Sequence, residues 1–172
     1  MPVEPTETLY SFGGDEVPPE FSGSWGIAPV DDPVSPGSLR SPLPPHTPGA
    51  SNSTALTVNL PHRGALRFRS RRVGDYYSDF EFRLNGSLEF SQRYSSDTGW
   101  SDYLMLLEAG EHELLWTHRS ASSTYLTPDE QDASYIDHIS YDAYIDDPVF
   151  TAVPAVAGQS LPPGATPAFF RS

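Results

Sequence analysis

Residues 65–86 read ALRFRSRRVGDYYSDFEFRLNG, and this stretch decides the fold class. Apolar and polar side chains alternate with period two on both sides of a short turn at Gly74 and Asp75, which is typical of two half-buried β-strands. We expect the two strands to form an antiparallel hairpin, with apolar pairs on one face and opposite charges on the other. The expected register pairs Leu66 with Leu84, Phe68 with Phe82, Arg71 with Asp79 and Arg69 with Glu81.

The same alternation recurs along the middle of the chain, with glycine-containing turns between the alternating segments. Strands are predicted over Ala55–Leu60, Ala65–Val73, Tyr77–Leu84, Leu88–Arg93, Tyr103–Leu107, Glu111–His118 and Ser134–Tyr144. No stretch sustains a helical period. Short strands at this spacing predict an all-β chain that folds as an antiparallel β-sandwich, or jelly roll.

Proline marks the expected domain boundaries, since 11 of the 18 prolines lie in residues 1–48 and five in residues 148–172. We predict an extended, proline-rich N-terminal arm over 1–20 and a β-sandwich over 21–146, of which 21–54 is a largely irregular entry segment. A second extended arm is predicted over 147–172.

Both arms contain aromatic side chains, which a solvated tail rarely retains. We therefore predict that Tyr10, Phe12, Phe169 and Phe170 contact neighbouring subunits. The alternative is that the arms pack on their own domain.

Composition excludes several functions. The formal net charge is −13, so binding to a nucleic-acid backbone is not expected. All ten basic residues are arginine and there is no cysteine, which excludes disulfides, thiolate metal sites and lysine Schiff bases. No apolar run is long enough for membrane insertion, and the N-terminal residues lack the features of a signal peptide, which predicts synthesis in a cytoplasm.

Enzyme signatures are also missing from the sequence. It contains no Gly-x-Ser-x-Gly elbow and no acidic spacing typical of a glycosidase, so we predict no catalytic residues. His112 and His118 share one face of a predicted strand with Trp116, which is more typical of packing than of a metal or acid–base pair. No cofactor or metal is predicted. Calcium is the alternative for the acidic second half, which contains Asp129, Asp132, Asp137, Asp142, Asp146 and Asp147.

Several segments spaced along residues 21–146 are distinctive. They are Trp25, Leu66-Arg67-Phe68, Tyr77 to Gly86, Gly99-Trp100, Ala109-Gly110-Glu111-His112-Glu113-Leu114-Leu115-Trp116 and Tyr135-Ile136-Asp137-His138-Ile139. Together they resemble the concanavalin A-like jelly-roll modules of the MAM and cleaved-adhesin type, which occur in bacterial surface and secreted proteins. The resemblance implies a β-sandwich in which Trp25, Trp100 and Trp116 pack in the core.

Modules of this type usually follow a signal peptide within a long multidomain protein, and this sequence shows neither feature. We therefore predict a non-enzymatic structural protein of a bacteriophage virion, a minor tail or tail-tip protein made in the host cytoplasm. Its expected partners are other virion proteins and further copies of itself, with the sandwich contacting a host-surface glycan. The alternatives are a capsid decoration or head-fibre protein and a free carbohydrate-binding module.

Two groups of side chains are candidate contacts for these partners. Sugars stack on exposed aromatic rings beside polar groups, which favours Tyr76, Tyr77 and Tyr125 as glycan contacts. Arg67, Arg69 and Arg71 share one face of a predicted strand and would contact an anionic partner. The alternative for the arginines is the cross-strand ladder with Asp79 and Glu81.

Overall fold

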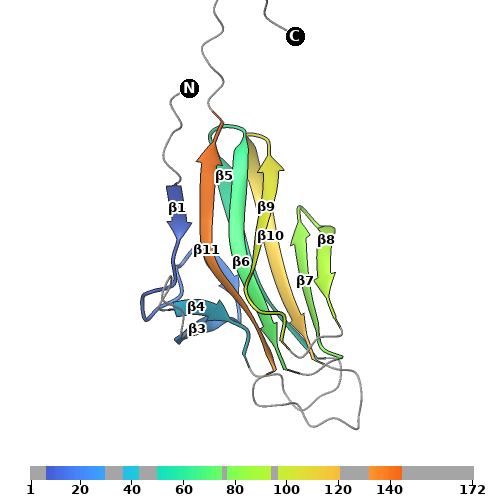
Figure 1. Cartoon of the computed structure of the whole chain (residues 1–172). Coiled ribbons are helices and arrows are strands. Elements are labelled where there is room, and N and C mark those ends of the chain that lie inside the picture. Colours follow the sequence, from blue (N-terminus) through green and yellow to red (C-terminus); the bar gives the residue numbers. More distant parts are fainter. Residues whose placement is uncertain are drawn as a thin grey trace, which may run out of the picture.

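The computed structural model describes residues 7–29, 37–42, 50–74, 77–93, 97–120 and 132–144. Within these residues the chain is all-β, and two antiparallel sheets pack face to face as a sandwich (Figure 1). The predicted fold class is therefore confirmed. No helix in this part of the chain is long and apolar enough to cross a membrane.

One sheet has six strands, in the order β3-β4-β11-β6-β9, with β1 also paired to β11. Its strands are β1 (Glu7–Tyr10), β3 (Gly26–Pro29), β4 (Gly37–Arg40), β6 (Gly64–Val73), β9 (Ser101–Leu107) and β11 (Ala133–Ala143). The other sheet has five strands, in the order β2-β5-β10-β7-β8. These are β2 (Phe21–Gly23), β5 (Ser51–Leu60), β7 (Asp79–Leu84), β8 (Ser87–Gln92) and β10 (Gly110–Arg119).

All seven strands predicted from the alternating pattern are present, and most of their bounds lie within two residues of the prediction. The largest difference is at β5, which begins at Ser51 instead of Ala55. The extra residues pair with Trp116 to Arg119 of β10, and of these four partners only Arg119 lies beyond the predicted strand. The period-two pattern is thus a reliable guide to the centre of this sandwich.

The predicted hairpin between β6 and β7 is wrong. β6 pairs with β11 and β9, whereas β7 pairs with β10 and β8 in the other sheet. Phe68 and Phe82 do meet, but across the interior, with ring centroids 4.9 Å apart. The expected charge pairs are replaced by Arg69 with Asp102, Arg71 with Asp97, Asp79 with Arg93 and Glu81 with Arg83.

The physical reason is that alternation fixes which face of a strand is buried, but not which sheet the strand joins. A link that crosses from one sheet to the other leaves the same local pattern as a tight hairpin. Gly74 begins this crossing with a φ of 124°, and a Cβ at this position would lie 2.3 Å from the Cα of Asp132. Only glycine fits that conformation and that close approach.

The N-terminal part of the chain contains four short strands that the sequence analysis did not predict. β1 pairs with β11, β2 with β5, and β3 and β4 with each other beside β11. Proline and the shortness of these strands hide their alternation. The described residues between 7 and 29 therefore extend both sheets of the same sandwich, and residues 147–172 lie outside the described part.

Phe12 lies in the interior of the sandwich and is only 1% exposed. Its ring meets that of Phe21 edge-on at 5.4 Å, and Phe21 in turn stacks against Trp116 at 6.5 Å. The pairing of β1 with β11 brings Phe12 into this position. Phe12 is thus part of the chain's own core and leaves no ring surface for the neighbouring subunit that the sequence analysis expected it to contact.

The packing of Phe12 leads to a stability prediction. Phe12→Ala should lower the free energy of unfolding by about 3–5 kcal/mol, because it empties a closed part of the aromatic core. Urea unfolding of the purified chain measures this loss. Tyr144→Ala is the matched control, since Tyr144 is 49% exposed and its removal should change stability by about 0.5 kcal/mol or less. Equal stability of the two variants would contradict the placement of Phe12.

Candidate functional site

The outer face of the six-stranded sheet gathers most of the chemically active side chains. Alternation along β6 turns Phe68 into the core and leaves Arg67, Arg69 and Arg71 on the outer face. The register with β9 sets Asp102 beside Arg69 and Leu104 beside Arg67. The predicted arginine stripe is therefore real as a geometric feature.

Each of these arginines lies beside a carboxylate. Arg67 Nε lies 3.2 Å from Asp142 Oδ2, and Arg69 Nε lies 3.5 Å from Asp102 Oδ1. Arg71 donates from Nε to Asp97 Oδ1 at 3.0 Å. The ladder to Asp79 and Glu81 is thus replaced by pairs with other acids. The charge of the stripe is balanced where an anionic partner was expected to bind.

The turn at Asp97 links the stripe to an aromatic side chain. The Asp97 carboxylate also accepts a hydrogen bond from the Gly99 amide at 2.8 Å, and Gly99 has a left-handed φ of 64°. The hydrogen bond from Arg71 is the main reason that the pKa of Asp97 lies below its usual range. An ionised Asp97 therefore holds Gly99 in place, and Gly99 directly precedes Trp100.

Trp100 is half-buried on the outer face, not in the core where the resemblance placed it; Trp25 and Trp116 are core residues as expected. Its ring lies 5.1 Å from the Arg69 guanidinium carbon and meets the Tyr135 ring edge-on at 6.4 Å. An aromatic ring over a guanidinium gains cation–π energy. The turn after β8 thus adds a flat, half-exposed ring to an otherwise polar surface.

Tyr135 extends this surface toward β4. Arg40 Nε donates to the Tyr135 hydroxyl at 3.0 Å, and its guanidinium carbon lies 5.7 Å from the centre of the same ring. Arg40, Tyr135, Trp100 and Arg69 therefore form a row across the sheet, which we call the aromatic–arginine row. Its two adjacent rings lie between two guanidinium groups, which are planar and rich in hydrogen-bond donors.

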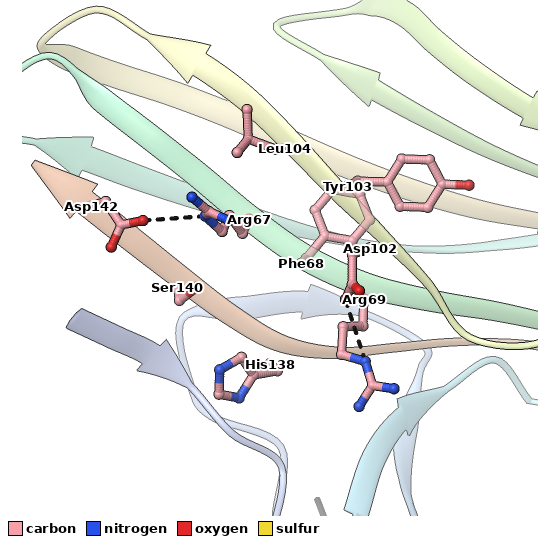
Figure 2. A pocket seen from close by; sticks show the side chains of 9 residues that line it. All are labelled: Arg67, Phe68, Arg69, Asp102, Tyr103, Leu104, His138, Ser140 and Asp142. Carbon is pink, nitrogen blue, oxygen red and sulfur yellow. Dashed lines mark hydrogen bonds and ion pairs between the residues drawn. The ribbon is translucent and has the colours of Figure 1, made fainter. Parts of the chain in front are cut away.

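Next to this row lies a hollow of about 490 Å³ on the same face (Figure 2). Its polar and charged lining consists of Arg67, Arg69, Asp102, His138, Ser140 and Asp142. The dashed lines in Figure 2 mark the two arginine–aspartate pairs, one on either side of the hollow. The sticks come from three neighbouring strands, β9, β6 and β11.

A β-bulge in β11 delivers His138 to this hollow. The three steps from Asp137 to Ser140 lie opposite only two steps of β6, from Arg69 to Arg67. His138 adopts a left-handed φ of 50°, and its amide donates to Asp137 Oδ1 at 2.7 Å. A non-glycine residue in this conformation is uncommon. Its sign in the sequence is the change of phase in the apolar positions from Ile136 to Ile139 and Tyr141.

The two carboxylates of the hollow do not form a glycosidase pair. Asp102 lies on β9 opposite Arg69, whereas Asp142 lies on β11 opposite Ala65. Two strand spacings and four residue steps separate their Cα atoms by about 16 Å. Even with both short aspartate side chains directed at each other, this exceeds the separation of about 5–9.5 Å between the carboxyl groups of a catalytic pair. Each carboxylate is also paired with an arginine, so neither is set up as a general acid.

A second polar cluster is buried at one end of the sandwich. His118 lies between Ser134 and Asp132, with Nδ1 2.9 Å from the Ser134 hydroxyl and Nε2 3.5 Å from Asp132 Oδ1. Ser78 donates to Asp132 Oδ2 at 2.7 Å. All four residues are at most 1% exposed, so a substrate cannot reach the serine, and the cluster ties β10, β11 and the approach to β7 together.

His112 lies apart from this cluster. Its ring contacts the Glu108 carbonyl and the Asn85 side chain at the turns beside β10. The described residues contain no group of three or more histidines and acids that could hold a metal ion. Of the aspartates considered for calcium, Asp132 and Asp137 are buried, Asp142 pairs with Arg67, and Asp129, Asp146 and Asp147 lie outside the described residues.

Of the three tyrosines predicted as glycan contacts, one lies within the described residues. Tyr77 is exposed just before β7, in the link between the two sheets, and Tyr76 and Tyr125 lie outside the described part, as do Phe169 and Phe170. Tyr10 is half-buried, with its ring edge-on to Phe21 at 5.0 Å. Burial, together with the Glu20 carboxylate, raises the pKa of Tyr10.

A second hollow, of about 440 Å³, lies between β1 and β5. Its lining includes Leu9, Tyr10, Leu60 and Tyr141 and contains no charged side chain. The hollow between β6, β9 and β11 is therefore the one that offers ionic and hydrogen-bonding groups as well as nearby aromatic rings. We take it, together with the aromatic–arginine row, as the candidate site.

The fold is similar to those of several solved protein structures. The K1 cleaved adhesin domain of Lys-gingipain from Porphyromonas gingivalis W83 has a TM-score of 0.57 and 14% identity, over 82% of this chain and 99% of that domain. The K3 cleaved adhesin domain of the same protein has a TM-score of 0.56 and 10% identity, over 81% and 98%. These likenesses show a shared β-sandwich fold and confirm at that level the resemblance to cleaved-adhesin modules.

TmCBM61 in complex with β-1,4-galactotriose has a TM-score of 0.47 and 14% identity, over 80% of this chain and 99% of that chain. This likeness is too weak to support an argument about the site. No protein family matches the sequence, and no curated protein sequence is similar to it.

The Asp97 turn leads to a prediction about pH. The lowered pKa means that the ion pair with Arg71 stabilises the fold above the pKa of an unfolded aspartate, about 3.9, and that this contribution is lost as pH falls through the lower folded-state value. Asp97→Asn should therefore be less stable than the parent at pH 7, by about 1 kcal/mol or less because the pair is partly exposed. The difference should shrink below pH about 4. Urea unfolding from pH 3 to pH 8 measures it, and a constant difference would contradict the assignment.

Proposed function

We propose that this chain is a non-enzymatic β-sandwich module that binds a glycan on the outer face of its six-stranded sheet. The observation that supports this most directly is the half-buried Trp100 ring over Arg69, beside Tyr135 and the hollow. A sugar ring presents an apolar face to aromatic side chains and hydroxyls to planar polar groups. The aromatic–arginine row provides both kinds of contact side by side.

The shape of the site favours an extended ligand. The row and the hollow lie along the face of a sheet built from β4, β11, β6 and β9, and not in a closed cavity. A polysaccharide chain laid across the strands would touch both. The fold shared with cleaved adhesin domains agrees with a binding role, although at 10–14% identity it supports only the scaffold.

The assignment to a bacteriophage virion stays a prediction from the sequence. This holds for the minor tail or tail-tip role, the virion location and the homo-oligomer, and also for the capsid decoration alternative. The burial of Phe12 removes one of the four aromatic side chains expected at subunit contacts. This favours the free carbohydrate-binding module over the tail protein.

A binding assay tests the proposed site. The purified chain is run in affinity electrophoresis against a panel of soluble polysaccharides, and the strongest ligand is then titrated. Trp100→Ala should weaken binding about tenfold or more, since a lost aromatic contact of about 1.4 kcal/mol has that effect. Trp100→Phe should keep most of the affinity, because it retains a flat ring.

Tyr77→Ala is the matched control, because it removes an exposed aromatic side chain outside the proposed site. Its affinity should equal that of the parent. Thermal unfolding of each variant separates lost binding from lost folding. Unchanged binding in Trp100→Ala together with lost binding in Tyr77→Ala would move the site to the tyrosine, and failure to bind any polysaccharide would refute the function.

A further inference from the structure

The formal charges of the arginines and aspartates that line the hollow sum to zero. Two arginines, Arg67 and Arg69, face two aspartates, Asp142 and Asp102, and each arginine Nε points at one carboxylate. The next pair along the stripe, Arg71 with Asp97, is balanced as well. At the hollow and along the stripe, a ligand therefore meets paired opposite charges that sum to zero.

A balanced surface of this kind suits hydroxyl groups. Guanidinium groups only donate hydrogen bonds and ionised carboxylates only accept them, whereas a hydroxyl does both. Adjacent hydroxyls of a sugar ring can therefore bridge a guanidinium and the carboxylate beside it. The ring is not required to bring a charge of its own.

An acidic sugar would meet repulsion at the same place. Its carboxylate or sulfate would approach Arg69 alongside Asp102, whose side chain is 87% exposed and stays at the rim of the hollow. The whole chain adds to this effect, because its formal net charge is −13. A polyanion would also be slowed in its approach by the field of the whole protein.

We infer that the glycan is a neutral polysaccharide, and that Asp102 and Asp142 exclude acidic ones. This inference rests on the proposed function and names the class of its ligand. It also assigns a role to the arginine stripe that differs from the anionic partner expected from the sequence. The arginines act as hydrogen-bond donors that their own aspartates keep electrically balanced.

The experiment compares neutral and charged polymers of matched backbone at pH 7. The probes are hydroxyethylcellulose with carboxymethylcellulose, dextran with dextran sulfate, and fully methyl-esterified with de-esterified pectin. The parent should bind at least one neutral polymer, and its acidic counterpart at least tenfold more weakly in 50 mM NaCl. Neutral binding should change less than twofold up to 500 mM NaCl, because no net charge is neutralised.

Asp102→Asn is the informative variant, since the exposed carboxylate is not needed for packing. It should bind the acidic polymer at least fivefold more tightly than the parent does, and 500 mM NaCl should abolish this gain. Glu108→Gln is the matched control: it removes the same charge from a 77% exposed acid that pairs with Arg63, outside the hollow. It should leave acidic binding unchanged.

The outcomes separate the inference from the proposed function. Tight acidic binding by the parent, without neutral binding, would overturn the inference and leave glycan binding standing. An equal gain in Asp102→Asn and Glu108→Gln would also overturn it, because the effect would then come from total charge. Binding of no polymer would refute the proposed function, and the inference with it.

Discussion

Phe68 packs among the rings of Phe82, Tyr103 and Trp116, at centroid distances of 4.9–5.4 Å, and the arrangement of both sheets depends on this contact. It fixes which residues of β6 face inward, because a slip of one position would send Arg67, Arg69 and Arg71 into the core. The arginine stripe outside is therefore a direct result of the aromatic packing inside. The candidate site and the core therefore lie on opposite faces of β6.

The sequence predicted strands best where one face of the strand is buried and the other is exposed to solvent. The strands from β5 to β11 could be predicted because their alternation is clear, as in Phe80, Phe82 and Leu84 of β7. Strand pairing was harder. The apolar partners Phe68 and Phe82 were correctly matched, but as neighbours in one sheet instead of across two. Alternation indicates which side chains of a strand are buried, but not which strand it pairs with.

The candidate site was only partly predictable for a related reason. The direction of Arg67, Arg69 and Arg71 follows from alternation, whereas their partners come from residues 26 to 75 positions away along the chain. Trp100 was expected in the core, and its outward position depends on the Asp97 turn. The four short N-terminal strands were not predicted because proline-rich sequence masks short pairings. Phe12 was expected at a subunit contact, and its burial matches the alternative that this segment packs on its own domain.

The bulge at His138 has a consequence for how the chain tolerates change in length. With this one extra residue, outward positions in β11 shift from odd to even numbers, so that Tyr135 and Asp142 both face outward while Ile136 and Tyr141 face inward. A chain shortened by one codon at His138 would regain an uninterrupted ladder with β6 and keep the same inside and outside. The pairing of β11 with β6 therefore does not need the extra residue, and the bulge serves to place the imidazole of His138 at the hollow.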